Sequence, residues 1–265
     1  MNNQSILFDQ LNSFFDKIYV ISLKKSSDRH PQIKKNLDGL DYEIFWGVDG
    51  SKLDLKELEE KNIYVPEIAV RDNFSGKELQ PGEIGCALSH LHIYKNIVKN
   101  GYRRTLILED DIFLSCDSEN TVLKAFRELP EDWEFLYIGY FTNDDEMTLP
   151  VKLRIHIAYP LLHYFGQTKY SAERLRRKFY RPYSENLERA GFHAGTHAYG
   201  VSLNGAKKIL SEQKPIRMAS DNIIGKMCID GNLNAFRFKK QLFFQYRDLP
   251  TTIKNRYEPE FNYKN

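Results

Sequence analysis

The sequence has few cysteines and no long apolar run. Its 265 residues include three cysteines, Cys86, Cys116 and Cys228, whose spacing fits no zinc motif. A sparse, odd number of cysteines argues against a disulfide framework and favours a reducing cytosol. No stretch approaches the roughly 20 apolar residues that span a bilayer. Residues 1–15 lack the basic start and the cleavage site of a secretory signal. We therefore expect a cytoplasmic protein, with peripheral contact at the inner membrane face as an open alternative.

Several enzyme signatures are also missing. The sequence has no G-x-x-x-x-G-K-[ST] loop, no G-x-G-x-x-G turn, no G-x-S-x-G elbow and no H-E-x-x-H helix. These absences weaken P-loop, dinucleotide-binding, α/β-hydrolase and zincin interpretations. The formal net charge of +2 is too small to indicate nucleic acid as a partner.

Short β-rich runs alternate with helical ones along the chain. We expect strands at Lys17–Leu23, Tyr42–Val48, Arg104–Leu108, Trp133–Tyr140 and Thr196–Leu203, and helices at Asp54–Lys61, Glu83–Lys99, Asn204–Glu212 and Ala219–Met227. A further helix through Ile33 and Leu37 is expected to be capped by Ser26 and Ser27. This alternation predicts an α/β fold around a mostly parallel sheet. We expect a single domain over residues 1–265, with an irregular excursion at about 140–190.

The excursion contains a cluster of basic residues. Between Gly166 and Ala190 there are seven basic and three acidic residues, a local net charge of +4. The cluster has two interpretations that the sequence leaves open. One is a solvated helix face, and the other is a contact of Lys169–Arg181 with phosphorylated acceptors or an anionic membrane.

Three acids, Glu109, Asp110 and Asp111, follow the strand Arg104–Leu108 directly. The carboxyl end of a strand faces the ligand crevice in open α/β sheets. Adjacent carboxylates repel, and a divalent cation with substrate phosphates would relieve that repulsion. The alternative is a solvated acidic turn.

The helix Glu83–Lys99 places Glu83, Cys86 and His90 on one side, flanking its apolar stripe. This side can overhang a site while the stripe packs on the sheet. Alternatively, Glu83 serves the helix dipole and His90 bonds to nearby backbone. Farther on, His193 and His197 have the spacing of a zinc-binding helix, but the glycine and β-like run around them argue against a helix. We expect a single histidine, His197, to close a metal or phosphate site.

Taken together, these motifs resemble glycosyltransferase family 25, which includes bacterial lipooligosaccharide galactosyltransferases and is related to collagen galactosyltransferases. The resemblance covers roughly residues 17–111 and 192–225. It rests on these segments: IYVISLKKSSDR at Ile18–Arg29, WGVDG at Trp46–Gly50, GEIGCALSHLH at Gly82–His92, LILEDDI at Leu106–Ile112, THAYGVSLNGAKKIL at Thr196–Leu210 and PIRMASD at Pro215–Asp221. The last segment is longer than the family's compact Pro-hydrophobic-Asp pattern.

The resemblance implies a GT-A-like fold, a UDP-sugar donor, a divalent cation (Mn²⁺ or Mg²⁺) and inversion at the anomeric carbon. It implies that Asp111 and Glu109 bind the metal, and His197 would complete the set of ligands. Asp221, the late acid of the family, becomes the base or a second metal ligand. The implied donor-side positions are Leu23, Arg29, Val48, Asp49, Gly50, Ser89, His90 and Asp110.

An inverting transfer needs a base for the acceptor hydroxyl. A bound cation would lower the proton affinity of the acids at 109–111, which leaves Asp221 and Glu83. The helix dipole makes Glu83 a weaker base. The small and apolar residues before Asp221 would raise its proton affinity if it is buried, so Asp221 is the first candidate and Glu83 the second.

Four functions are compatible with these motifs. The first is transfer of a hexose, galactose favoured and glucose possible, from a UDP-sugar to a glycan or glycolipid acceptor of lipooligosaccharide, lipopolysaccharide or capsule. The second is glycosylation of hydroxylysine in a collagen-like protein. The third and fourth are a metal-dependent phosphoesterase and a non-catalytic carbohydrate-binding module.

Overall fold

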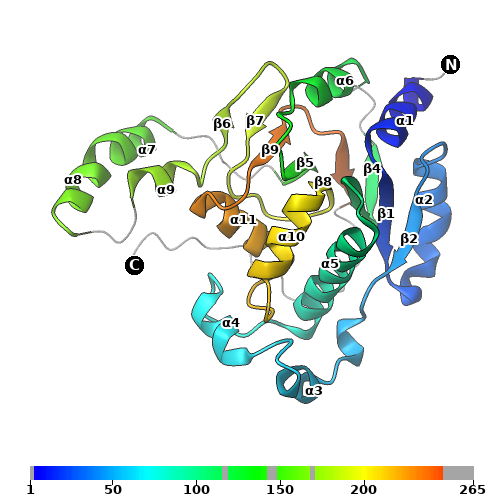
Figure 1. Cartoon of the computed structure of the whole chain (residues 1–265), viewed down its shortest axis with the longest axis horizontal. Coiled ribbons are helices and arrows are strands. Elements are labelled where there is room, and N and C mark those ends of the chain that lie inside the picture. The colour runs from blue at the N-terminus through cyan, green and yellow to red at the C-terminus, as the bar shows by residue number, and fades with distance from the viewer. Residues whose placement is uncertain (1–2, 115–118, 142–147, 168–170, 247–265) are drawn as a thin grey trace.

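The computed structural model describes residues 3–114, 119–141, 148–167 and 171–246. Its centre is an eight-stranded sheet with the strand order β2-β1-β3-β8-β5-β9-β7-β6 (Figure 1). The strands are β1 (Lys17–Ser22), β2 (Glu43–Trp46), β3 (Arg104–Glu109), β5 (Phe135–Gly139), β6 (Arg181–Pro182), β7 (Leu187–Arg189), β8 (Ala198–Ser202) and β9 (Ala235–Phe238). Two more, β4 (Ile112–Leu114) and β10 (Phe243–Gln245), pair separately and antiparallel.

Strands β2, β1, β3, β5 and β9 run in one direction, and β8 lies antiparallel between β3 and β5. At the far edge, the short antiparallel β6–β7 ribbon adds to β9. This is the expected α/β class, with a central sheet in which most strands run in one direction. The parallel strands β1, β2 and β3 therefore end at one common edge of the sheet.

Two apolar cores cover the two faces of the sheet. Along β3, Ile107 belongs to the core shared with α5, α10 and α11, whereas Leu106 and Leu108 belong to the core shared with α1, α2 and α6. Period-two alternation along a strand sends neighbouring side chains to opposite faces. The helices are α1 (Asn3–Phe14), α2 (His30–Asn36), α3 (Leu55–Glu60), α4 (Pro66–Asp72), α5 (Pro81–Asn100), α6 (Glu119–Glu128), α7 (Leu149–Leu153), α8 (Tyr159–Tyr164), α9 (Ala172–Arg176), α10 (Leu203–Glu212) and α11 (Ser220–Asp230).

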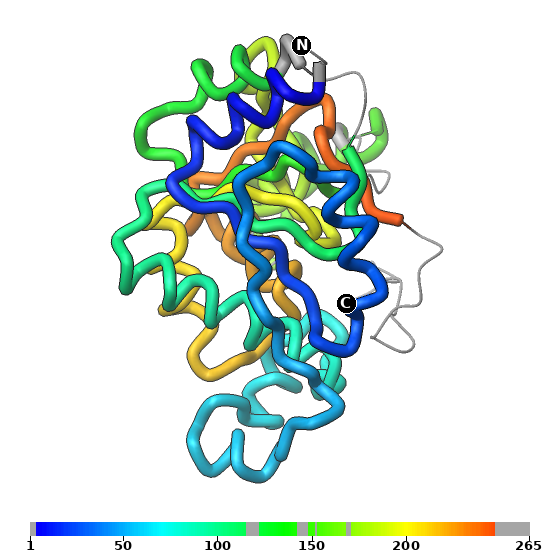
Figure 2. Tube along the Cα trace, turned by 90° about the vertical axis from the view of Figure 1, so that its right-hand side faces the viewer, coloured from blue at the N-terminus to red at the C-terminus, as the bar shows by residue number. Residues whose placement is uncertain are grey.

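Helix α5 begins and ends at residues that are typical of helix ends. Pro81 opens it, and Gln80 and Glu83 form a capping box. Gly101 ends it in the left-handed conformation that glycine adopts readily. Helices α3 and α4 extend at the bottom of the molecule in both views (Figures 1 and 2). Among the helices of the described residues, none has the length and apolar character to cross a membrane.

The structure corrects several expectations. Ser26 and Ser27 do not cap a helix; they lie inside a 3-10 helix (Lys24–Arg29) that leads into α2. Within the expected excursion at 140–190, residues 149–164 form one helical run, because α7, a π-helical turn (Arg154–Ala158) and α8 follow one another without a break. Residues 3–14 form a helix and residues 235–245 contribute two strands, neither of which we expected. Cys116 and Lys169 lie outside the described residues.

Candidate active site

Strand register brings the ends of β1, β2 and β3 together. In the ladders, Ile21 pairs with Glu109 and Ser22 pairs with Trp46. The three chain segments that leave this edge are therefore adjacent. Most of the candidate residues lie on them or on the first turns of α5 and α11.

Asp110 is held in place by two donors from the first segment of the chain. The Ser22 hydroxyl donates to Asp110 Oδ2 at 2.7 Å, and Arg29 Nη1 donates to Asp110 Oδ1 at 2.7 Å. The same guanidinium nitrogen lies 3.8 Å from Asp111 Oδ2. The single guanidinium therefore offsets part of the negative charge of these carboxylates.

Glu109 and Asp111 are joined by one side chain from the far end of the chain. Gln245 Nε2 lies 3.1 Å from Glu109 Oε2 and 2.9 and 3.0 Å from the Asp111 oxygens. Burial raises the pKa of Asp111, and the nearby Asp110 raises it further, while the Gln245 hydrogen bond acts in the opposite direction. An ionised carboxylate has about four lone-pair sites, so carboxylates that accept from the same amide can still bind a cation.

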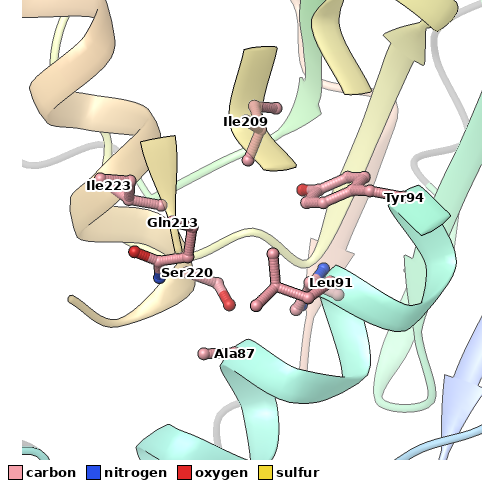
Figure 3. A pocket seen from close by; sticks show the side chains of 8 residues that line it. Ala87, Leu91, Tyr94, Ile209, Gln213, Ser220 and Ile223 are labelled. Atoms are coloured by element: carbon pink, nitrogen blue, oxygen red, sulfur yellow. The ribbon is translucent and has the colours of Figure 1, made fainter. Parts of the chain in front are cut away.

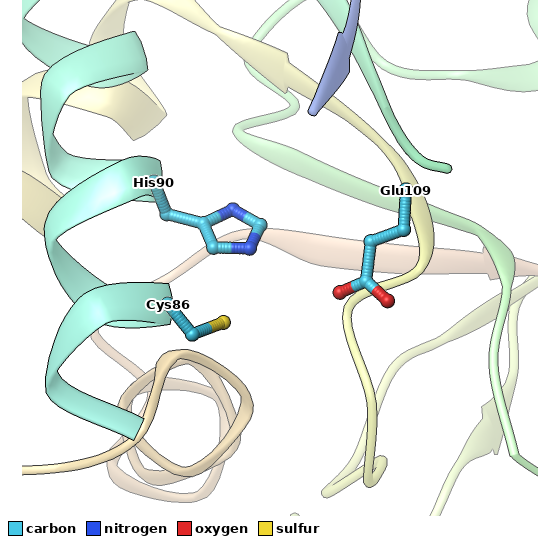
Figure 4. Close-up of side chains that lie close together, drawn as sticks. All are labelled: Cys86, His90 and Glu109. Atoms are coloured by element: carbon cyan, nitrogen blue, oxygen red, sulfur yellow. The ribbon is translucent and has the colours of Figure 1, made fainter. Parts of the chain in front are cut away.

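A second group of ligand-type side chains faces the same acid. The ligand atoms of Cys86, His90 and Glu109 lie within 4.8 Å of one another. Cys86 and His90 point from α5 toward the carboxylate of Glu109 at the end of β3 (Figure 4). Asp111 and His197 are not members of this group, although Asp111 shares the Gln245 amide with Glu109.

His90 is oriented by two tyrosines. His90 Nδ1 lies 2.7 Å from the Tyr199 hydroxyl, which lies 2.7 Å from the Tyr94 hydroxyl. Complete burial lowers the pKa of His90 to about 4, so the imidazole is neutral at pH 7. With Nδ1 engaged by Tyr199, Nε2 is the ring nitrogen left for the group in Figure 4.

Behind His90 there is a small cavity between α5, α10 and α11. Its volume is about 10 Å³, and Figure 3 shows its lining residues Ala87, Leu91, Tyr94, Ile209, Gln213, Ser220 and Ile223. Such a volume holds at most one water molecule. The cavity is therefore too small to be a substrate pocket.

The implied donor loop, residues 47–50, packs tightly on α5. The Ser89 hydroxyl accepts from the Val48 amide at 2.8 Å and donates to the Gly85 carbonyl at 2.7 Å. A Cβ on Gly50 would lie 2.0 Å from the Pro81 carbonyl oxygen, and a Cβ on Gly85 would lie 2.7 Å from Val48 O. Glycine is thus required on both sides of this contact. Ser89 positions the loop from a buried place in the helix.

Asp49 caps the 3-10 turn Gly50–Lys52 on the solvent side of this loop. Its Oδ1 accepts from Lys25 Nζ at 2.8 Å and from the Ser51 amide at 3.1 Å. The Lys25 hydrogen bond is the main reason that the pKa of Asp49 falls to about 2. The side chain of Leu23, at the end of β1, comes within 3.2 Å of a Cβ placed on Gly47 in the same loop.

The two candidate bases have different surroundings. Asp221, in the first turn of α11, accepts from the Gly195 amide at 2.9 Å and the Asn222 amide at 2.8 Å. Glu83 accepts from the Gln80 amide at 2.8 Å and closes the capping box of α5. Glu83 therefore has a structural function at the start of α5, which is the type of role that its place in the first turn also allows.

Loop 193–197 connects Asp221 with the acidic segment. The Gly195 amide reaches Asp221, and the His197 carbonyl accepts from the Glu109 amide at 2.8 Å. The His197 imidazole is buried against the end of β5, since a Cβ on Gly139 would lie 2.6 Å from His197 Nε2. His197 thus links β8, β3 and β5 through backbone and packing.

The residues present fit a divalent cation. Glu109 and Asp111 offer carboxylate oxygens, the ligands that suit Mg²⁺ and Mn²⁺. Burial raises the pKa of Asp111, and a bound cation would favour its charged form. The group of Cys86, His90 and Glu109 contains sulfur and nitrogen and would suit a softer ion such as Zn²⁺.

Comparison with known proteins identifies relatives of the chain. Over 201 residues it is 27% identical to procollagen galactosyltransferase 2 of Mus musculus, a match that covers 74% of this chain and 27% of the mouse protein. It is 25% identical over 210 residues to probable inactive glycosyltransferase 25 family member 3 of Bos taurus, covering 77% of this chain and 30% of that one. The chain thus spans less than a third of the length of these relatives.

A solved structure and a family model complete the comparison. Mouse xyloside xylosyltransferase 1 in its apo form matches with a TM-score of 0.38 and 10% identity, covering 89% of this chain and 79% of that one. The family model described as glycosyltransferase family 25 (LPS biosynthesis protein) matches residues 15–224. That match covers every strand of the eight-stranded sheet except β9, the acidic segment and the first turn of α11. The chain belongs to glycosyltransferase family 25.

Proposed function

We propose that the protein is one glycosyltransferase domain that transfers galactose from UDP-galactose to an acceptor hydroxyl with inversion. The observation that supports this most is the acidic segment at the carboxyl end of β3, with Arg29 bound to Asp110. Membership of a transferase family and a relative named as a galactosyltransferase favour galactose over glucose. We propose that the protein is catalytically active. One relative is named as a probable inactive family member, so this activity needs a direct test.

Each part of the site has a proposed task. The loop 47–50, fixed on α5 through Ser89, would hold the nucleotide. Asp111 and Glu109 would hold Mn²⁺ or Mg²⁺, and Arg29 and Asp110 would orient the diphosphate beside them. The ion would neutralise the charge that develops on the leaving UDP. Trp46 and His30, whose rings lie 5.5 Å apart, would exclude water from this end of the sheet.

The proposed base is Asp221. Its two backbone hydrogen bonds fix the carboxylate at the start of α11, on the same side of the molecule as Cys86, whose Sγ lies 3.9 Å from Ser220 Oγ. Glu83 is the second candidate, and its bond to the Gln80 amide ties it to helix capping. General-base catalysis typically contributes about 10²–10⁴-fold.

Two acceptors are proposed. The first is a glycan or glycolipid of lipopolysaccharide, lipooligosaccharide or capsule, in keeping with the description of the family. The second is hydroxylysine of a collagen-like protein, which the procollagen galactosyltransferase relative supports. For the first acceptor we propose a cytoplasmic location, with Lys169–Arg181 as a peripheral contact with anionic membrane.

A donor screen tests the proposal. The purified chain is incubated with UDP-galactose, UDP-glucose and UDP-N-acetylhexosamines, with Mn²⁺ or with chelator, and UDP release is measured. We expect release from UDP-galactose above all, dependent on the metal. Asp111→Ala should abolish this release, and Glu59→Ala, which removes an exposed acid of α3 that has no part in the proposed site, is its matched control. No donor turnover, or turnover that chelator leaves unchanged, would refute the proposal.

A further inference from the structure

Helices α7 and α8, joined by the π-helical turn, expose an unusual row of apolar side chains. We call this row the apolar ridge: Leu149, Leu153, Ile157, Leu161 and Phe165, with exposed fractions of 70%, 52%, 57%, 56% and 69%. Single exposed apolar residues are normal on a protein surface. A contiguous row of large ones marks an interaction site.

The members of the apolar ridge are spaced four residues apart, and the backbone keeps them on one side. In an α-helix, residues four apart drift around the axis by about 40° for each step. The π-helical turn at Arg154–Ala158 has wider turns, so four residues there fall short of a full turn and the drift reverses. The turn therefore realigns the row between α7 and α8.

The opposite side of this helical run faces the protein. Ile155 is buried at 4% exposure, and Val151, Ala158 and Leu162 are half-buried. Figure 1 shows α7 and α8 at the left margin of the molecule, with α9 between them and the body. The helix is thus anchored by one face and presents the apolar ridge outward.

The charge around the apolar ridge has one sign. Residues 148–167 include one lysine and one arginine and no acid. Arg154, His156 and His163 are exposed beside the ridge. In the neighbouring α9, Arg174 and Arg177 are paired with Asp230 and Glu173, so acids offset the charge of these two arginines.

We propose that the apolar ridge inserts into the surface of an anionic lipid bilayer. A helix with a continuous apolar face, basic flanks and no acids lies in the headgroup region and buries that face about 5–10 Å deep. The flanking cations match anionic headgroups, which is the observation that selects a lipid surface over an uncharged protein groove. None of the ridge residues belongs to the proposed active site, so the contact with lipid can be tested apart from the proposed transfer reaction.

Vesicle flotation tests the inference without donor or acceptor. The full chain is mixed with vesicles of phosphatidylglycerol and phosphatidylcholine, or of phosphatidylcholine alone. We expect binding to the anionic vesicles that weakens at high salt. The variant Leu153→Ser/Ile157→Ser/Leu161→Ser should bind at least a hundredfold more weakly, since each exposed aliphatic side chain that enters lipid is worth about tenfold.

The matched control is Leu55→Ser/Val70→Ser/Leu123→Ser, which removes three apolar residues of 40%, 41% and 39% exposure elsewhere on the surface. It should bind as the wild type does, and thermal melts verify that both triple variants fold. Three results would overturn the inference: no binding of the wild type to anionic vesicles, equal binding of the ridge variant, or a wild-type dimer that the ridge variant converts to monomer.

Discussion

Burial of His90 should make the stability of the protein depend on pH below 6.5. The folded pKa is about 4 because the imidazole loses its hydration, whereas an unfolded histidine titrates near 6.5. As pH falls through this window, the unfolded chain takes up a proton that the folded protein does not. The stability is therefore complete above pH 6.5 and is lost toward pH 4. The pKa difference, at 1.36 kcal/mol for each unit, limits the loss to about 3 kcal/mol.

Urea unfolding at pH 7 and pH 4.5 measures this effect in the wild type and in His90→Gln. Glutamine cannot titrate and retains polar atoms for the Tyr199 hydroxyl. We expect the wild type to lose about 2–3 kcal/mol more than the variant between the two pH values. His156→Gln, at an exposed position, should follow the wild type. Parallel pH profiles for wild type and His90→Gln would show that His90 is not held neutral by burial.

Three further changes probe the site. Asp111→Ala should abolish donor turnover while the melting temperature holds or rises, because burial disfavours the charge on this carboxylate; near-normal turnover would exclude its role. Asp221→Asn should slow transfer by about 10²–10⁴-fold with metal-dependent UDP binding intact, and loss of that binding would make Asp221 a ligand. Gly85→Ala should destabilise the fold by about 1–3 kcal/mol, because its Cβ would lie 2.7 Å from Val48 O and Gly50 N; an unchanged urea midpoint would contradict that packing.

The elements with strong local signals could be predicted from the sequence. The strands β1 and β3 are apolar runs, and α5 has Pro81 at its start and Gly101 at its end, so their positions are within a few residues of those expected. The acidic segment was expected at the carboxyl end of β3, and it lies there. These predictions succeed because apolar pattern and end signals agree with the tertiary packing.

The partners across the site could not be predicted. Gln245 joins Glu109 and Asp111 across 136 and 134 residues of sequence, and it lies in a three-residue strand that we did not expect from the sequence. The group of Cys86, His90 and Glu109 had a partial signal, since Cys86 and His90 are four residues apart on one helix face. The apolar ridge also had a partial signal in the sequence, a four-residue repeat of large apolar residues. It lies in the segment that we expected to be irregular.

A metal-assisted UDP site at the end of β3 is the central claim, and calorimetry of UDP binding tests it most directly. We predict that the wild type binds UDP with Mn²⁺ present and loses most of its affinity with chelator, because the carboxylates of 109–111 repel a diphosphate unless a cation lies between them. Asp111→Ala should bind weakly under both conditions. Equal affinity of the wild type with Mn²⁺ and with chelator would contradict the central claim.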